Sequence, residues 1–129
     1  MNEASFDRYA AFNQRIDRRS LMERAVQIVL ARRKRIELFG PTMFREPAWD
    51  MLLALYLASE NQRLTIGRLT EAAGIPTTTA LRWIQYLVDQ RLVVRESHPT
   101  DARSVFVELS GKGKARIDLY LYETLTIGR

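Results

Sequence analysis

Apolar residues recur with the period of an α-helix along the first third of the chain. Residues 4–19 carry them on one side and predict a first helix. A second helix is expected to begin at Ser20, because Ser20-x-x-Glu23 has the form of a capping box. It runs to residue 39 and is apolar over an arc wider than packing on one small core requires. The Gly-Pro pair at 40–41 ends it.

The helical period continues through the middle of the chain. Pro47 opens a helix whose apolar positions keep the helical spacing. A short helix is expected at about 66–73 and another at about 77–90, with a turn at Gly74 between them. Two short helices joined by a glycine-containing turn form the helix-turn-helix pattern. The sequence therefore predicts this motif in the middle of the chain.

Beyond residue 90 the apolar period changes from 3.6 to 2. Residues 93–97 and 104–109 are interpreted as the two strands of a hairpin, with residues 98–103 at its tip. Ser110 then caps a last helix. A hairpin directly after a helix-turn-helix is the wing of a winged helix. The expected fold is mainly α, of the α+β class: a winged helix-turn-helix with further helices at both ends.

Composition narrows the possible chemistry. The chain has 129 residues, no cysteine and one histidine, His98. These counts exclude disulfides, thiolate metal sites, a cysteine nucleophile and, within one chain, a metal site with two histidine ligands. No catalytic residue, metal site or cofactor is therefore expected, and the chain is not expected to be an enzyme. His98 is interpreted as a turn residue.

The length corresponds to a single domain. No apolar run approaches the ~20 residues that a membrane span needs. The first residues lack the basic start and apolar stretch of a signal peptide. We therefore expect a cytoplasmic protein with no membrane partner.

The net charge of +5 is concentrated at the amino end. Residues 1–35 hold nine basic and four acidic side chains, whereas residues 36–129 hold eleven of each. Within the second part, residues 74–116 are locally basic, with seven basic and four acidic side chains. A basic excess favours a polyanionic partner. The basic amino end is interpreted either as an arm on DNA or as the charged outside of a dimer interface.

Two short motifs follow each other near the carboxyl end of the chain. Asp101-Ala102-Arg103 is an Asp-x-Arg motif at the hairpin tip, and residues 109–113 read Leu-Ser-Gly-Lys-Gly at the next helix start. Because these motifs occur in this order and at this spacing, the chain from Pro47 to about Lys114 resembles the MarR family of winged-helix transcriptional regulators. That family usually has a glycine where this chain has Arg91, so the shape of that turn stays open.

The resemblance implies a bacterial transcriptional regulator that binds a palindromic duplex DNA site as a homodimer, with repression as the usual outcome. The helix at about 77–90 would be the recognition helix, and the hairpin at about 93–109 the wing. On a helical wheel, Ala80, Trp83, Ile84 and Leu87 fall on the core side. The residues expected to contact DNA are Thr77, Thr78, Thr79, Leu81, Arg82, Gln85, Tyr86, Arg95, Asp101, Arg103 and Lys112.

The expected contacts differ in what they read. Arg82 suits guanine and Gln85 suits adenine in the major groove. Arg103 is expected to reach the minor groove or its phosphates, oriented by Asp101. The alternative for these two residues is a surface ion pair that shapes the turn. Further phosphate contacts are expected from Arg68, Arg95, Lys112 and Lys114.

The end helices are expected to form the dimer interface, as in the resembling family. Residues 1–46 would be a basic dimerisation segment, 47–114 the DNA-binding region and 115–129 the carboxyl-terminal helix of one domain. The expected interface residues are Leu21, Ala25, Ile28, Val29, Ile117, Leu121 and Leu125. The alternative is that this apolar arc packs within the monomer.

Two further hypotheses concern partners. A small aromatic ligand, known for many members of the resembling family, would be bound by Phe44, Arg45, Trp49 and Tyr56. The main alternative function is a winged helix for protein–protein contact without sequence-specific DNA binding. Its partner patch would consist of Leu81, Tyr86 and Phe106.

Overall fold

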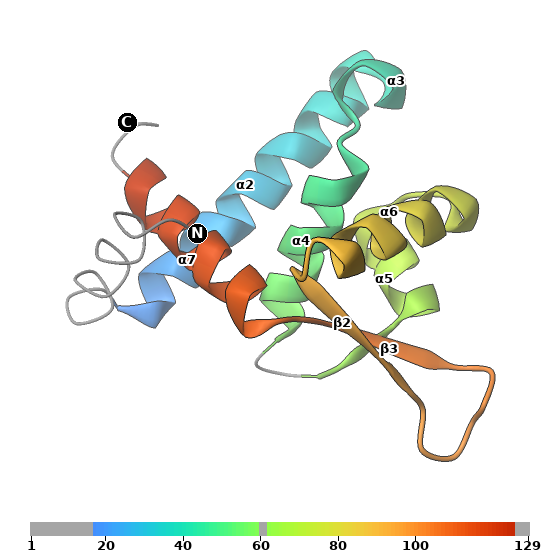
Figure 1. Cartoon of the computed structure of the whole chain (residues 1–129). Coiled ribbons are helices and arrows are strands. Elements are labelled where there is room, and N and C mark those ends of the chain that lie inside the picture. The colour runs from blue at the N-terminus through green and yellow to red at the C-terminus, as the bar shows by residue number, and fades with distance from the viewer. Residues whose placement is uncertain (1–16, 60–61, 126–129) are drawn as a thin grey trace.

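The computed structural model describes residues 17–59 and 62–125. Most of the helix expected at 4–19 lies outside these residues. The elements, in chain order, are α2 (Arg18–Phe39), α3 (Pro41–Phe44), α4 (Pro47–Ala58), β1 (Leu64–Thr65), α5 (Ile66–Ala73), α6 (Thr77–Asp89), β2 (Val93–Ser97), β3 (Val105–Leu109) and α7 (Gly111–Thr124). The predicted fold class is confirmed: α4 to β3 form a winged helix-turn-helix, and α2 and α7 pack beside it (Figure 1).

The wing is a small antiparallel sheet in the order β1-β3-β2. Val93 to Ser97 of β2 pair residue by residue with Leu109 to Val105 of β3. The two-residue strand β1 was not expected from the sequence; it adds a third strand by pairing Leu64 with Val107. The β2–β3 hairpin extends away from the helices (Figure 1).

Two apolar clusters stabilise the chain. The first lies inside the winged helix and contains Met51, Leu55, Leu64, Leu69, Ile75, Ala80, Ile84, Leu87, Val93 and Val107. The second joins α2, α4 and α7 through Leu21, Ala25, Leu53, Tyr56, Ile117, Leu119 and Leu121. Since α4 contributes to both clusters, it connects the winged helix to the two outer helices.

The start of helix α2 differs from the sequence expectation. Helix α2 begins at Arg18, and Asp17 is its N-cap, accepting a hydrogen bond from the amide of Arg19 at 3.1 Å. The capping box expected at Ser20 is therefore wrong, because an Asx cap earlier in the chain already satisfies the first turn. Helix α6 begins at Thr77, as the sequence predicted, with Pro76 at its N-cap.

The junction between α6, the wing and α7 depends on Arg91 and Gly113. Arg91 adopts φ +61°, so the left-handed turn typical of glycine is kept without a glycine. The hydroxyl of Ser110 donates to the Arg91 carbonyl at 2.6 Å and accepts from the Gly113 amide at 3.0 Å. A Cβ at Gly113 would lie 2.1 Å from the carbonyl oxygen of Leu92. Close contact with the backbone of Leu92 therefore explains why the second glycine of the Leu-Ser-Gly-Lys-Gly motif has no side chain.

A buried polar contact ties the three helices of the second cluster together. Asp118 of α7 and Tyr56 of α4 are almost wholly buried. The Tyr56 hydroxyl donates to the Asp118 carboxylate at 2.8 Å, and the guanidinium of Arg18 on α2 also donates to it. Burial, together with the hydrogen bond to Asp118, raises the pKa of Tyr56 well above its usual 10. A charge buried in this way is satisfied by partners from two other helices.

Candidate nucleic-acid interface

The first helix of the helix-turn-helix, α5, is capped at both ends. The Thr65 hydroxyl accepts from the Arg68 amide at 3.2 Å and begins α5. Gly74 ends α5 in the left-handed conformation, at φ +66°. Its amide donates to the carbonyl of Thr70 at 2.9 Å, and its own carbonyl accepts from the side chain of Arg45. These contacts define where α5 begins and where the turn follows it.

Helix α6 presents a polar outer side, as the sequence predicted. Ala80, Ile84 and Leu87 are buried against the core. The residues that the structure leaves exposed include Thr77, Thr78, Leu81, Arg82, Gln85 and Tyr86, whereas Thr79 is half-buried. Trp83 was expected in the core, but 37% of it is exposed. This prediction was wrong because Trp83 lies at the margin of the buried side, beyond the reach of the neighbouring elements.

Gln85 connects α6 to the wing. Its amide nitrogen donates to the carboxylate of Asp89 at 2.9 Å, and its amide oxygen accepts from the Arg95 guanidinium at 2.8 Å. Arg95 lies on β2, so this contact joins the predicted recognition helix to the first wing strand. The side chains predicted to contact adenine and phosphate are therefore hydrogen-bonded to each other in the free protein.

The wing tip is an ordered turn rather than a loose loop. His98 Nδ1 accepts from the amides of Thr100 at 3.1 Å and Asp101 at 3.0 Å. This confirms that His98 is a turn residue. The carboxylate of Asp101 accepts from the Arg103 amide at 3.0 Å and from the Ser104 hydroxyl at 3.1 Å. These hydrogen bonds, the Arg103 amide first, lower the pKa of Asp101 below its usual 3.8.

Arg103 extends from this turn into solvent. Its side chain is 94% exposed, and its Nε lies 3.6 Å from Asp101 Oδ1. The Asp-x-Arg motif therefore fixes the backbone of Arg103 and holds its guanidinium only loosely. Such a side chain is free to reach a partner beyond the tip.

Arg63 stabilises one face of the wing, a role that was not expected from the sequence. Its guanidinium lies 4.2 Å from the centre of the Phe106 ring, and the ring of His98 stacks on Phe106 at 5.0 Å. Arg63 also forms ion pairs with Glu96 of β2, at 2.7 Å, and with Glu108 of β3. No local pattern signals this contact, because Arg63 lies 33 residues or more before its partners.

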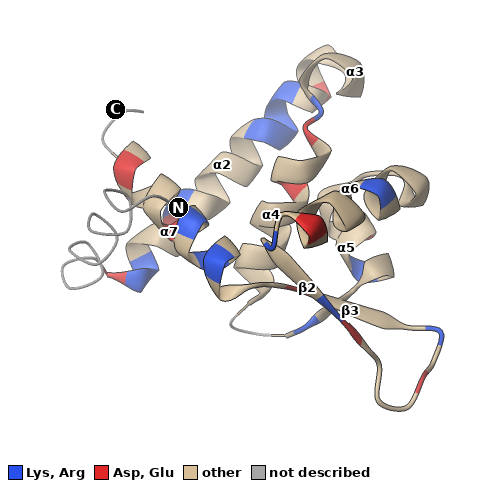
Figure 2. Ribbon diagram, in the orientation of Figure 1, with Lys and Arg blue, Asp and Glu red and all other residues tan. Residues whose placement is uncertain are grey.

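Basic residues occur on several elements of the winged helix and at the start of α7 (Figure 2). Lys and Arg lie on α6, on β2, at the wing tip and at the start of α7, with acidic residues among them (Figure 2). Lys112 donates to the carbonyl of Gln90 at 3.1 Å, at the junction of α6 and the wing. Arg68 is exposed on α5, and Lys114 is half-buried. The basic residues predicted for phosphate contact therefore lie on several elements.

The predicted dimerisation residues lie mostly inward in the single chain. Leu21, Ala25, Ile117 and Leu121 are buried in the second cluster, and Ile28, Val29 and Leu125 pack partly against it. The buried apolar residues of α2 therefore pack within the single chain, as the alternative interpretation expected. Other apolar residues of the same helix are exposed, among them Val26 at 42% and Leu30 at 57%.

The four residues proposed for an aromatic ligand do not gather at one place. Tyr56 is buried and bonded to Asp118. Trp49 packs edge to face on Tyr120 at 4.9 Å, whereas Phe44 lies against Phe39 at 5.6 Å. Arg45 is held by the turn after α5. Each side chain therefore has different surroundings.

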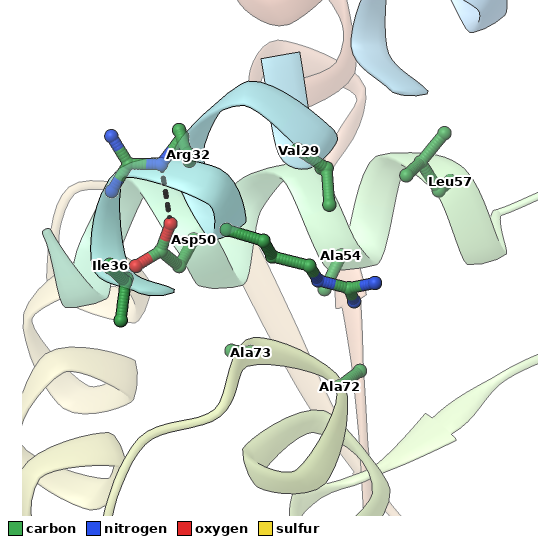
Figure 3. A pocket seen from close by; sticks show the side chains of 9 residues that line it. Val29, Arg32, Ile36, Asp50, Ala54, Leu57, Ala72 and Ala73 are labelled. Carbon is green, nitrogen blue, oxygen red and sulfur yellow. Dashed lines mark hydrogen bonds and ion pairs between the residues drawn. The ribbon is translucent and has the colours of Figure 1, made fainter. Parts of the chain in front are cut away.

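A separate hollow lies between α2, α4 and α5 (Figure 3). Its volume is about 170 Å³, and it is lined by Val29, Arg32, Arg33, Ile36, Asp50, Ala54, Leu57, Ala72 and Ala73. Arg32 is buried at its edge and binds Asp50 at 2.6 Å and Glu46 at 3.2 Å. Within the described part of the chain, Arg32 Nη2 is buried without a hydrogen-bond partner. The hollow therefore has mostly apolar walls, with the ion pair of Arg32 and Asp50 at its edge.

Two negative findings concern the described residues alone. Among residues 17–59 and 62–125, no group of three or more acidic or histidine side chains is placed to hold a metal ion. In the same residues, no helix has the length and hydropathy to cross a membrane.

The sequence and the structure of the chain are similar to those of known proteins. Residues 45–104, which include the helix-turn-helix and most of the wing, match the model of the MarR family. No curated protein sequence shows a significant match to the chain.

Solved structures are similar over more of the chain. AdcR, the adhesin competence repressor from Streptococcus pyogenes, is 28% identical, with a TM-score of 0.51 over 61% of this chain and 59% of that one. A MepR-like protein complexed with pseudoligands is 26% identical, with a TM-score of 0.50 over 57% of this chain and 51% of that one. This chain thus spans between half and three-fifths of these two relatives.

The apo form of MarR from E. coli extends the similarity of fold. It is 21% identical, with a TM-score of 0.53 over 81% of this chain and 76% of that one. At this identity the likeness concerns the fold alone, and it covers more of this chain than the two structures above.

Proposed function

The winged helix of the chain, residues 45–104, matches the MarR family, and from this premise we propose that the chain is a transcriptional regulator that binds duplex DNA. The exposed side of α6 would enter the major groove, and the wing would reach the adjacent minor groove. The observation that carries the proposal is the wing tip, where an ordered turn extends Arg103 into solvent. An arginine held in this way suits the narrow, electronegative minor groove of A·T-rich DNA.

The polar side of α6 supports the same function. Arg82 lies opposite the buried residues Ala80 and Ile84, with its side chain exposed. The major groove admits an α-helix, and an exposed guanidinium on such a helix can donate two hydrogen bonds to guanine O6 and N7. Gln85 and Arg95 would exchange their mutual hydrogen bond for contacts to a base and a phosphate. Sequence preference would thus come from α6, and orientation from the wing.

The proposal includes a homodimer on a palindromic site. Two copies related by a two-fold axis would present their α6 helices about one DNA turn, roughly 34 Å, apart. The exposed apolar residues Val26 and Leu30 of α2 support an interface on this helix. Sedimentation of the wild-type chain and of Leu30→Glu tests this point. A dimer that Leu30→Glu converts to a monomer supports the interface, and a monomeric wild type contradicts it.

A repressor is the outcome that the relatives support, since AdcR is a repressor. Control by a small aromatic acid is the finer proposal, supported by the mostly apolar hollow of Figure 3 and by Arg33 among the residues that line it. Benzoate is the probe. It should raise the melting temperature of the wild type and raise it less for Arg33→Ala, because Arg33 lines this hollow. Equal shifts in the two proteins would place benzoate elsewhere.

The experiment for DNA recognition compares a selected duplex with a random one. A duplex is first enriched from a random library on the wild-type protein, and affinities are then measured by fluorescence anisotropy. The wild type should prefer the selected duplex, and Arg82→Ala should lose about 1–3 kcal/mol of that preference if Arg82 binds a guanine. Arg19→Ala, which removes a charge at the far end of α2, is the matched control. Equal binding of both duplexes by the wild type would instead favour the protein–protein interaction module.

A further inference from the structure

One flank of α6 carries an aromatic corner formed by Trp83 and Tyr86. The two rings pack edge to face, with centroids 5.6 Å apart and planes at 85°. Trp83 is 37% exposed and Tyr86 is 52% exposed. With Thr79 and Arg82 they line a hollow in the surface of the helix. Two large apolar rings thus lie on the helix that is proposed to enter DNA.

The corner is not needed to fill the core. Ala80, Ile84 and Leu87 already provide the buried side of α6. Aromatic rings usually stabilise a protein by being buried, so leaving two of them exposed gives up much of that gain. Each ring restricts the motion of the other, and each has only two side-chain torsions to order. A rigid apolar surface of this kind loses little conformational freedom when it binds a partner.

One group in the major groove of DNA is apolar, as the rings of Trp83 and Tyr86 are. The edges of the bases present hydrogen-bond donors and acceptors there, and thymine adds an apolar C5-methyl group. Building on the proposed DNA-binding function, we propose that the corner of Trp83 and Tyr86 contacts a thymine methyl group. It does so beside the base pair that Arg82 contacts. These residues would then determine a preference for thymine that hydrogen bonding alone does not give.

Duplex DNA is the occupant that the surroundings favour. Arg82 and Tyr86 are four residues apart, about 6 Å along the helix axis, which corresponds to one or two base-pair steps. Arg82 places a positive charge inside the hollow, which suits a polyanion better than an apolar protein surface. The thymine is therefore expected within two base pairs of the guanine that Arg82 contacts.

The test removes the methyl group without changing the base pairing. In the selected duplex, each thymine is replaced in turn by deoxyuridine, and affinity is measured for the wild type, Trp83→Ala, Tyr86→Ser and Leu81→Ala. For the wild type, binding should weaken about three- to fivefold at one or two positions in each half-site, as expected for one buried methyl group. The ratio of the two affinities is measured within each protein, so partial unfolding of a variant cancels.

The variants separate the possible readers of the methyl group. Trp83→Ala and Tyr86→Ser should bind the thymine and deoxyuridine duplexes equally. Leu81→Ala changes the other exposed apolar side chain expected at the DNA, on the opposite flank of α6; it should keep the wild-type ratio even if it binds both duplexes more weakly. Equal binding of both duplexes by the wild type, or a ratio that persists in both aromatic variants, overturns this inference and leaves DNA recognition intact. If no library duplex binds at low salt, both this inference and the proposed function fail.

Discussion

Gly113 lies against the carbonyl oxygen of Leu92, so closely that a side chain at position 113 would overlap it at 2.1 Å. The contact joins the first turn of α7 to the residue that precedes β2. Because the obstacle is backbone, it cannot move aside as a flexible side chain would. The relation of the wing to α7 therefore depends on the absence of one Cβ atom.

Gly113→Ala should destabilise the chain strongly. Forcing a methyl group into a packed site costs typically about 1–3 kcal/mol, and a backbone obstacle places this variant at the upper end or beyond. Urea unfolding followed by circular dichroism measures the free energy. Gly111→Ala is the control, since nothing lies within 4 Å of a Cβ there. Equal stability of the two variants would show that the close contact does not constrain the protein.

Arg91→Gly should stabilise the chain. Arg91 adopts φ +61°, which costs a residue with a side chain about 1–2 kcal/mol that glycine avoids. The greater freedom of glycine in the unfolded chain offsets part of this, so we expect a net gain of about 0.5–1 kcal/mol. Gln90→Gly is the control: its φ of −80° gives glycine no advantage, and it should destabilise. A loss of stability in Arg91→Gly contradicts the expectation.

The contact of Tyr56 with Asp118 predicts a loss of stability at high pH. The pKa of Tyr56 is raised in the folded state, so its contribution is fully present below pH 10, the unfolded value. It is lost progressively as the pH rises above 10, because folding then opposes ionisation of the hydroxyl. Tyr56→Phe should cost about 1–3 kcal/mol at pH 7, since the buried carboxylate loses a donor. The difference between the wild type and Tyr56→Phe should shrink above about pH 10, and a difference that stays constant would contradict this.

Asp101 should keep the wing tip ordered in mildly acid solution. Its pKa is lowered in the folded state, so its contribution is present above 3.8 and is lost only as the pH falls through the lower folded value. Carbon NMR of the labelled carboxyl group measures this titration. Asp101→Asn should weaken binding of the selected duplex severalfold while leaving the melting temperature nearly unchanged. A titration at or above 3.8 would show that the turn does not hold the carboxylate.

The sequence predicted the parts of the fold that local patterns encode. The change of period after residue 90 located the wing, and the polar side of α6 follows from its helical spacing. The start of α2 was misplaced because Ser20 and Asp17 are both good caps, and the choice depends on contacts of the following turn. Trp83 was misplaced because a helical wheel shows which residues share a side but not how far the covering elements extend.

Contacts between residues that are far apart in the chain could not be predicted from the sequence. Arg63 meets Glu96 and Glu108 in a fold where the adjacent strand β1 pairs with β3. Arg18 and Asp118 are 100 residues apart and meet only because α2 and α7 pack together. Charged side chains of this kind look like ordinary surface residues until the tertiary fold brings their partners.

The central claim is that α6 and the wing bind duplex DNA, and the salt dependence of binding by the wild type and Arg103→Ala tests it most directly. For the wild type, log K for the selected duplex should fall steeply with log salt, by about 0.9 for each phosphate contacted. Arg103→Ala should bind more weakly and with a slope smaller by about one contact, whereas Arg19→Ala should match the wild type. Binding that is insensitive to salt, or a slope that Arg103→Ala leaves unchanged, would contradict the proposed role of the wing.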